Sequence, residues 1–130
     1  MLRKGKGFTL VELLVVMAIL ATLLSIAAPR YFGAVERAKE NALRQSLAVM
    51  RDGIDKYYGD NGRYPDDLED LVKRRYLRVL PVDPFTDSAE SWIFVPPPPG
   101  SDGKPLPGRL YDVRSGAPGK TKAGGELADL

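Results

Sequence analysis

The chain has 130 residues, 19 basic and 17 acidic side chains, a formal charge of +2, and neither cysteine nor histidine. A chain of this length accommodates one membrane segment and one small domain. Without cysteine it has no disulfide framework, and without either residue type it lacks the usual ligands for zinc, haem and thiol chemistry.

The positive charge is concentrated at the N-terminus, where Arg3, Lys4 and Lys6 precede an apolar segment. Without these three residues, 16 of the 19 basic side chains remain against 17 acidic ones, a formal charge of −1. Net charge therefore gives no support for binding to nucleic acid, and no nucleic-acid partner is expected.

The apolar segment runs from Phe8 to Ala28 and contains only four polar residues, Thr9, Glu12, Thr22 and Ser25. As a helix rising about 1.5 Å per residue it is roughly 30 Å long, enough to cross the hydrocarbon layer of a bilayer. The preceding positive charges favour a cytoplasmic N-terminus, with the rest of the chain on the far side of the membrane. The sequence predicts a single-pass membrane protein.

Glu12 is unusual in such a segment, because a carboxylate inside a bilayer costs on the order of 2.5–3.5 kcal/mol. One interpretation is that Glu12 lies near the cytoplasmic interface and reaches back to water. A second is that it pairs with a positive charge as part of a function. A secretory signal peptide cleaved after Ser25-Ile26-Ala27-Ala28 is a further alternative, although Glu12 and the length of the run disfavour it.

The string Lys6-Gly7-Phe8-Thr9-Leu10-Val11-Glu12-Leu13-Leu14, after a short basic leader, resembles the N-terminus of the type IV pilin and pseudopilin superfamily. The resemblance implies that a membrane peptidase cuts between Gly7 and Phe8 and methylates the new amino terminus of Phe8. It also implies that this amino group pairs with Glu12 of a neighbouring subunit and so sets the register of a filament. Residues 1–7 are then a leader, residues 8–28 a membrane and filament-core helix, and residues 29–130 a periplasmic globular domain.

The helix is expected to continue past the membrane segment, from about Phe8 to Asp60. Pro29 predicts a kink, because proline lacks an N–H and clashes with the preceding turn. Beyond it, apolar residues recur at helical spacing and require a small domain to cover them. These residues are Leu43, Leu47, Met50, Ile54 and Tyr57.

The remaining chain predicts a short helix over 66–74 and two strands over 91–95 and 109–114, separated by a proline-rich loop. From residue 115 onward glycine, proline and lysine predominate, which indicates a flexible tail over 115–130 whose last apolar residues could still dock. The fold class predicted is α+β: a long N-terminal helix, half membrane-spanning and half amphipathic, packed on a small domain with a short helix and a small antiparallel sheet.

The segments Tyr57–Pro65 and Leu80–Phe85 extend the resemblance to the major pseudopilin of type II secretion. That resemblance implies a calcium ion in the C-terminal loop, with Asp87, Asp102 and Asp112 as candidate ligands. The loop after Val113 carries no carboxylate, however, although calcium requires several oxygen ligands. No other cofactor is expected.

The resulting hypothesis is a structural subunit of a type II secretion pseudopilus, not an enzyme. Expected partners are other copies of the chain, minor pseudopilins, the inner-membrane assembly platform and the prepilin peptidase. The alternatives are a surface type IV pilin or minor pilin for motility, adhesion or DNA uptake, and a membrane-anchored interaction protein that is never processed.

Overall fold

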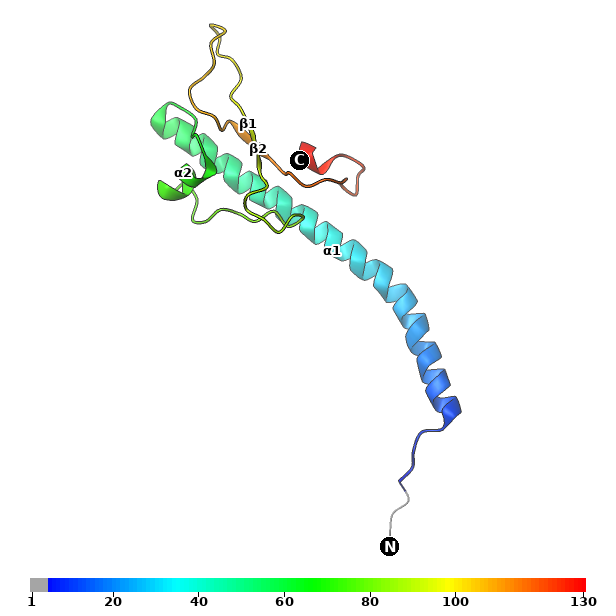
Figure 1. The fold of residues 1–130 in the computed structure, drawn as a ribbon. Helices are drawn as coiled ribbons and strands as arrows, with labels where there is room; N and C mark the ends of the chain where they lie inside the picture. Colours follow the sequence, from blue (N-terminus) through cyan, green and yellow to red (C-terminus); the bar gives the residue numbers. More distant parts are fainter. Residues whose placement is uncertain (1–4) are drawn as a thin grey trace. The chain divides into compact units, whose positions relative to one another are not determined.

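The computed structural model describes residues 5–130; the leader charges Arg3 and Lys4 lie outside this range. It contains the helices α1 (Leu10–Asn61) and α2 (Leu68–Lys73), the strands β1 (Ile93–Val95) and β2 (Asp112–Arg114), and a short 3-10 helix, η1 (Leu127–Asp129) (Figure 1). The chain divides into two compact units, one ending at Glu36 and one beginning at Arg37. Helix α1 begins in the first unit and ends in the second.

The first unit consists mainly of the apolar half of α1. Every large apolar side chain from Leu10 to Ile26 is exposed, and the most covered of them, Val16, is still 45% exposed. The 18-residue window that identifies this helix as a candidate membrane span has a mean hydropathy of 2.6. Pro29 lies inside the helix, which continues on either side of it, and the kink predicted there stays a prediction.

The second unit has a hydrophobic core built on the amphipathic half of α1. The apolar stripe predicted from spacing is confirmed, since Leu43, Leu47, Met50, Ile54 and Tyr57 are all buried. Side chains from the rest of the unit cover them; these are Leu68, Leu71, Leu77, Trp92, Leu110, Val113, Ala117 and Leu127.

Gly53 is also buried in this stripe, and its lack of a side chain allows close packing. A Cβ at this position would lie 3.3 Å from a methyl carbon of Leu77 and 3.7 Å from one of Leu71. Alanine here would remove the cost of glycine in a helix, about 1 kcal/mol, but its Cβ would press against the Leu77 side chain.

Helix α2 is two residues shorter at its start than predicted, because Asp67 serves as its N-cap and accepts a hydrogen bond from the backbone N–H of Glu69 at 3.3 Å. Acidic residues in its first turn and Lys73 in its last turn follow the helix dipole.

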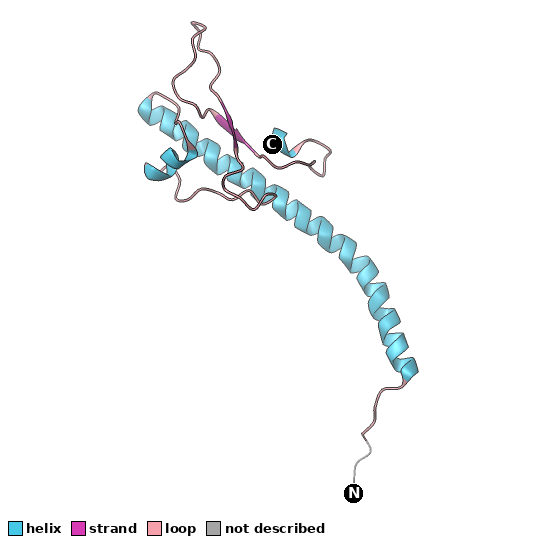
Figure 2. Cartoon of the chain, viewed as in Figure 1, coloured by secondary structure: helices cyan, strands magenta, loops and turns pink. Residues whose placement is uncertain are grey.

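The predicted strands are present but short. Strands β1 and β2 pair antiparallel, with Phe94 opposite Val113, and Val113 points into the core. Between them the proline-rich loop (residues 96–107) is closed by a bridge between Pro99 and Pro105. Figure 2 shows how little of the second unit after α1 is regular structure.

The tail over 115–130 is folded against the second unit, and its last apolar residues, Leu127 and Leu130, pack on the core. Leu127 is 2% exposed, and its N–H donates to the carbonyl of Gly119 at 3.0 Å. The backbone N–H of Thr121 donates to the carbonyl of Gly125 at 2.7 Å, and η1 follows. Composition predicted flexibility, but these local hydrogen bonds satisfy the backbone and one leucine supplies the anchor.

Candidate functional site at the start of helix α1

The predicted cleavage site lies in an irregular segment immediately before α1. Gly7 and Phe8 are exposed and outside the helix, and the Phe8 side chain is 86% exposed. A Cβ built on Gly7 meets no atom within 4 Å. The fold of this chain therefore places no demand for glycine at position 7, and a peptidase can reach this bond without unwinding the helix.

The first turn of α1 is closed by reciprocal hydrogen bonds between Thr9 and Glu12. The backbone N–H of Glu12 donates to the Thr9 hydroxyl at 3.1 Å, and the backbone N–H of Thr9 donates to a Glu12 carboxylate oxygen at 3.2 Å. This arrangement is a capping box, which satisfies two of the unpaired N–H groups that every helix N-terminus carries.

The capping box gives Glu12 a partner in the uncut chain that the sequence prediction did not include. The pattern Thr-x-x-Glu is a known sign of a helix start, so Thr9 could have been found from the sequence. The carboxylate remains on the surface, where it lines a shallow hollow with Lys6, Gly7 and Phe8. It can therefore still accept a bond from an incoming cationic group.

The apolar half of α1, which follows this site along the chain, presents an uncovered hydrophobic surface. A groove along it is lined by Val15, Ala18, Ile19, Thr22 and Leu23. The hydroxyls of Thr22 and Ser25 donate back to helix carbonyls, at 2.8 and 2.7 Å, so they add little polarity to this surface. The surface requires either lipid or other apolar helices as its surroundings.

Two of the three aspartates proposed as calcium ligands have hydrogen-bond partners within the fold, and the third is exposed, so calcium binding stays a prediction. Asp112 pairs with Arg51 at 2.7 Å, Asp102 accepts from the backbone N–H of Lys104 at 3.2 Å, and Asp87 lies exposed in a turn. Within residues 5–130 no group of three or more acidic side chains gathers as a metal site. Calcium usually takes six to eight oxygen ligands, so these carboxylates alone do not supply a complete shell.

A buried carboxylate that the sequence did not single out is Asp83. It is fully buried and accepts hydrogen bonds from the N–H of Phe85 at 2.9 Å and from the hydroxyl of Ser115. The same hydroxyl accepts from the N–H of Ala117 at 3.1 Å. Asp83 thus joins the turn over 83–88 to the start of the tail, a structural role with no pattern in the sequence to predict it.

Known proteins match both the N-terminal segment and nearly the whole length of the chain. Residues 2–28 match the family model of the prokaryotic N-terminal methylation motif. Type II secretion system core protein G of Pseudomonas aeruginosa PAO1 is 31% identical over 144 aligned positions, covering 98% of this chain and 94% of the relative. The protein of the same name from Escherichia coli K12 is 30% identical, covering 88% of this chain and 83% of the relative. The chain belongs to the pseudopilin family of type II secretion system core protein G.

A further relative of the same name, from Dickeya chrysanthemi, is 34% identical over 99 positions, covering 64% of this chain and 65% of the relative. No solved structure matches the chain significantly. The resemblance deduced from the Gly7–Glu12 string is confirmed, as is the α+β fold with its long apolar N-terminal helix.

Proposed function

We propose that this pseudopilin is a structural subunit of a type II secretion pseudopilus, held in the inner membrane by α1 before it joins a periplasmic filament. The observation that carries the proposal is the exposed apolar half of α1, which bears a single carboxylate, Glu12, in its first turn. Transfer from lipid to a bundle of like helices keeps this surface away from water at both stages.

Processing follows from the position of the site. Cleavage between Gly7 and Phe8 removes the basic leader and leaves a new amino group at Phe8, which is then methylated. The leader charges oppose withdrawal from the membrane, because they favour the cytoplasmic side. The N-terminus then starts in the cytoplasm and the second unit lies in the periplasm.

Glu12 then has two partners in succession. In the uncut chain its carboxylate accepts the Thr9 N–H at 3.2 Å. In the filament it pairs with the Phe8 amino group of the adjacent subunit. A misplaced subunit leaves charged groups unpaired in an apolar environment, at roughly 3–5 kcal/mol, and this penalty selects the correct register.

The proposal implies as partners further copies of the chain, minor pseudopilins, the assembly platform of the inner membrane and the prepilin peptidase. The role is structural, because the site offers an assembly contact and not a set of groups for covalent chemistry. Calcium is not assigned a role, since the candidate carboxylates do not converge.

Deletion of the gene in its host tests the choice of filament system. We expect secreted enzymes to accumulate in the periplasm, while twitching motility and DNA uptake stay normal. Intact secretion with lost motility or uptake would assign the chain to a surface pilus instead. A full-length mature protein that begins at Met1 would support an unprocessed membrane anchor.

A further inference from the structure

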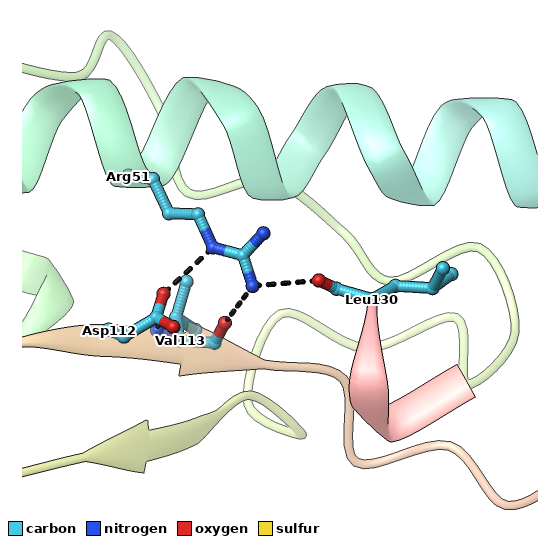
Figure 3. A network of polar contacts seen from close by, with 4 residues as sticks. All are labelled: Arg51, Asp112, Val113 and Leu130. Carbon is cyan, nitrogen blue, oxygen red and sulfur yellow. Dashed lines mark hydrogen bonds and ion pairs between the residues drawn. The ribbon is translucent and has the colours of Figure 1, made fainter. Parts of the chain in front are cut away.

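Arg51, on the amphipathic half of α1, reaches three oxygen atoms that come from the C-terminal half of the second unit (Figure 3). Its Nε donates to Oδ1 of Asp112 at 2.7 Å. Its Nη2 donates to the backbone carbonyl of Val113 at 3.1 Å and to the main-chain oxygen of Leu130 at 3.0 Å. The three acceptors lie 61 to 79 residues away in the sequence.

The carboxylate of Asp112 and the main-chain oxygens of Val113 and Leu130 thus lie around a single guanidinium group, and oxygen atoms of these kinds favour a cation. The planar fork of donors of the guanidinium suits several acceptors at once. The charge-assisted bonds to it are about twice as strong as neutral ones.

We propose that this oxygen set is a cation site occupied by the guanidinium of Arg51. The guanidinium then holds the segments of the second unit together without a divalent metal. The group joins α1, strand β2 and the end of the tail. It thereby links distant segments of the second unit, as a bound metal ion links segments in other proteins.

Three features argue against a metal at this position. Asp112 supplies the only carboxylate side chain in the set, and its Oδ1 already accepts the N–H of Val113 at 2.8 Å as well as Arg51. The positively charged guanidinium occupies the position that a metal ion would have to take. The neighbouring residues Arg114, Lys120 and Lys122 add further positive charge to the segment.

The location gives the contact more weight than an ordinary surface ion pair. The side chains of Arg51 and Asp112 are 36% and 29% exposed, and the adjacent Met50 and Val113 are fully buried. On the same helix, Arg44 forms an ion pair with Glu40 at 2.8 Å, but its side chain is 53% exposed and the pair is local. Arg44 therefore serves as a control for the removal of an arginine from α1 that contacts the tail only indirectly, through Glu40 and its bond from the N–H of Lys122.

The test uses the full-length protein in detergent micelles and follows thermal unfolding of the second unit. Trp92 is the single tryptophan and is buried, so its fluorescence reports on this unit alone. We expect the unfolding midpoint of the wild type to be the same, within about 1 °C, in EDTA and in millimolar calcium. A rise of several degrees with calcium would overturn the proposal.

The variants locate the effect. Arg51→Met keeps the aliphatic stem and should lower the midpoint by about 5–10 °C, in EDTA and in calcium alike. Arg44→Met should lower it by no more than about 2 °C. Arg51→Lys should fall between wild type and Arg51→Met, because a single ammonium group cannot reproduce the fork. Equal midpoints for Arg51→Met and Arg44→Met would contradict the assignment.

A double substitution distinguishes a shared site from two separate effects. If Asp112 acts through Arg51, Arg51→Met combined with Asp112→Asn should lower the midpoint little further than Arg51→Met alone. Additive losses would show that the two residues act independently, and the proposal would fail.

Discussion

At the scale of single residues, Gly7 and Glu12 lie outside the second unit, and Glu12 takes part in the fold only through its capping box with Thr9. Gly7 has open space around it, and Glu12 lies exposed beside it. Both residues could be changed without disturbing the second unit, whose core begins at Leu43. Loss of function in such variants would therefore report on processing and assembly.

Replacement of Gly7 by valine should block cleavage, so that the precursor accumulates in the membrane. Because a Cβ at this position meets nothing within 4 Å, any effect arises at the peptidase and not from misfolding. Gly5→Val is the matched control, since Gly5 has equally open surroundings and precedes the scissile bond by two residues. Immunoblotting for precursor and mature forms checks this, and mature-size protein from Gly7→Val would refute the peptidase assignment.

Gly108 is a residue that the fold itself requires. Its φ is +105°, and a Cβ there would lie 2.2 Å from the carbonyl oxygen of Tyr64. Gly108→Ala should therefore lower the free energy of unfolding by about 2–4 kcal/mol. Gly59→Ala, in α1 with no neighbour within 4 Å, should instead raise it by up to about 1 kcal/mol. Denaturant unfolding followed by Trp92 fluorescence measures both, and equal effects would contradict this account.

At the scale of elements, the sequence predicted what depends on periodicity and local chemistry. The stripe from Leu43 to Tyr57 fixed the buried face of α1, and the Gly7–Glu12 string identified the family. Contacts between distant segments had no such pattern. The Arg51–Asp112 pair spans 61 residues, and neither residue differs in the sequence from any other exposed charge. Flexibility of the tail was predicted from its composition, whereas its structure depends on a few hydrogen bonds and one buried leucine.

We expect the attachment of the tail to α1 to depend on pH through Glu40. The hydrogen bond from Arg44, and then the one from the N–H of Lys122 at 3.3 Å, lower the pKa of Glu40 below its usual 4.5. A lowered pKa means that the ionised form favours folding above the unfolded pKa, and that this contribution is lost as pH falls through the folded pKa.

Glu40→Gln tests this linkage. The variant should unfold at a lower temperature than the wild type at pH 7, and the difference should shrink as pH falls below about 4.5. Glu36→Gln, on the same helix, is the control and should show a smaller difference. Thermal unfolding across pH measures this, and a gap that widens in acid would show that the sign is wrong.

At the scale of the whole molecule, the two units have different requirements. The second unit buries its own core and fastens its tail, whereas the first unit exposes nearly all of its apolar side chains. An exposed surface of this kind is stable only in lipid or among like helices. Under the proposed function the chain passes from one apolar environment to another, and the proposal assigns to Glu12 the contact that differs between them.

The most direct measurement compares processing and assembly of Glu12→Leu in the same cells. In a simple membrane anchor this change removes a carboxylate that costs roughly 3 kcal/mol in a bilayer, and it should only strengthen retention. In a filament subunit it removes the partner of the Phe8 amino group. Glu12→Asp keeps the charge on a shorter side chain and should be intermediate. We expect Glu12→Leu protein to be cleaved normally but absent from sheared filaments, and cleaved Glu12→Leu protein that assembles at the wild-type level would contradict the account.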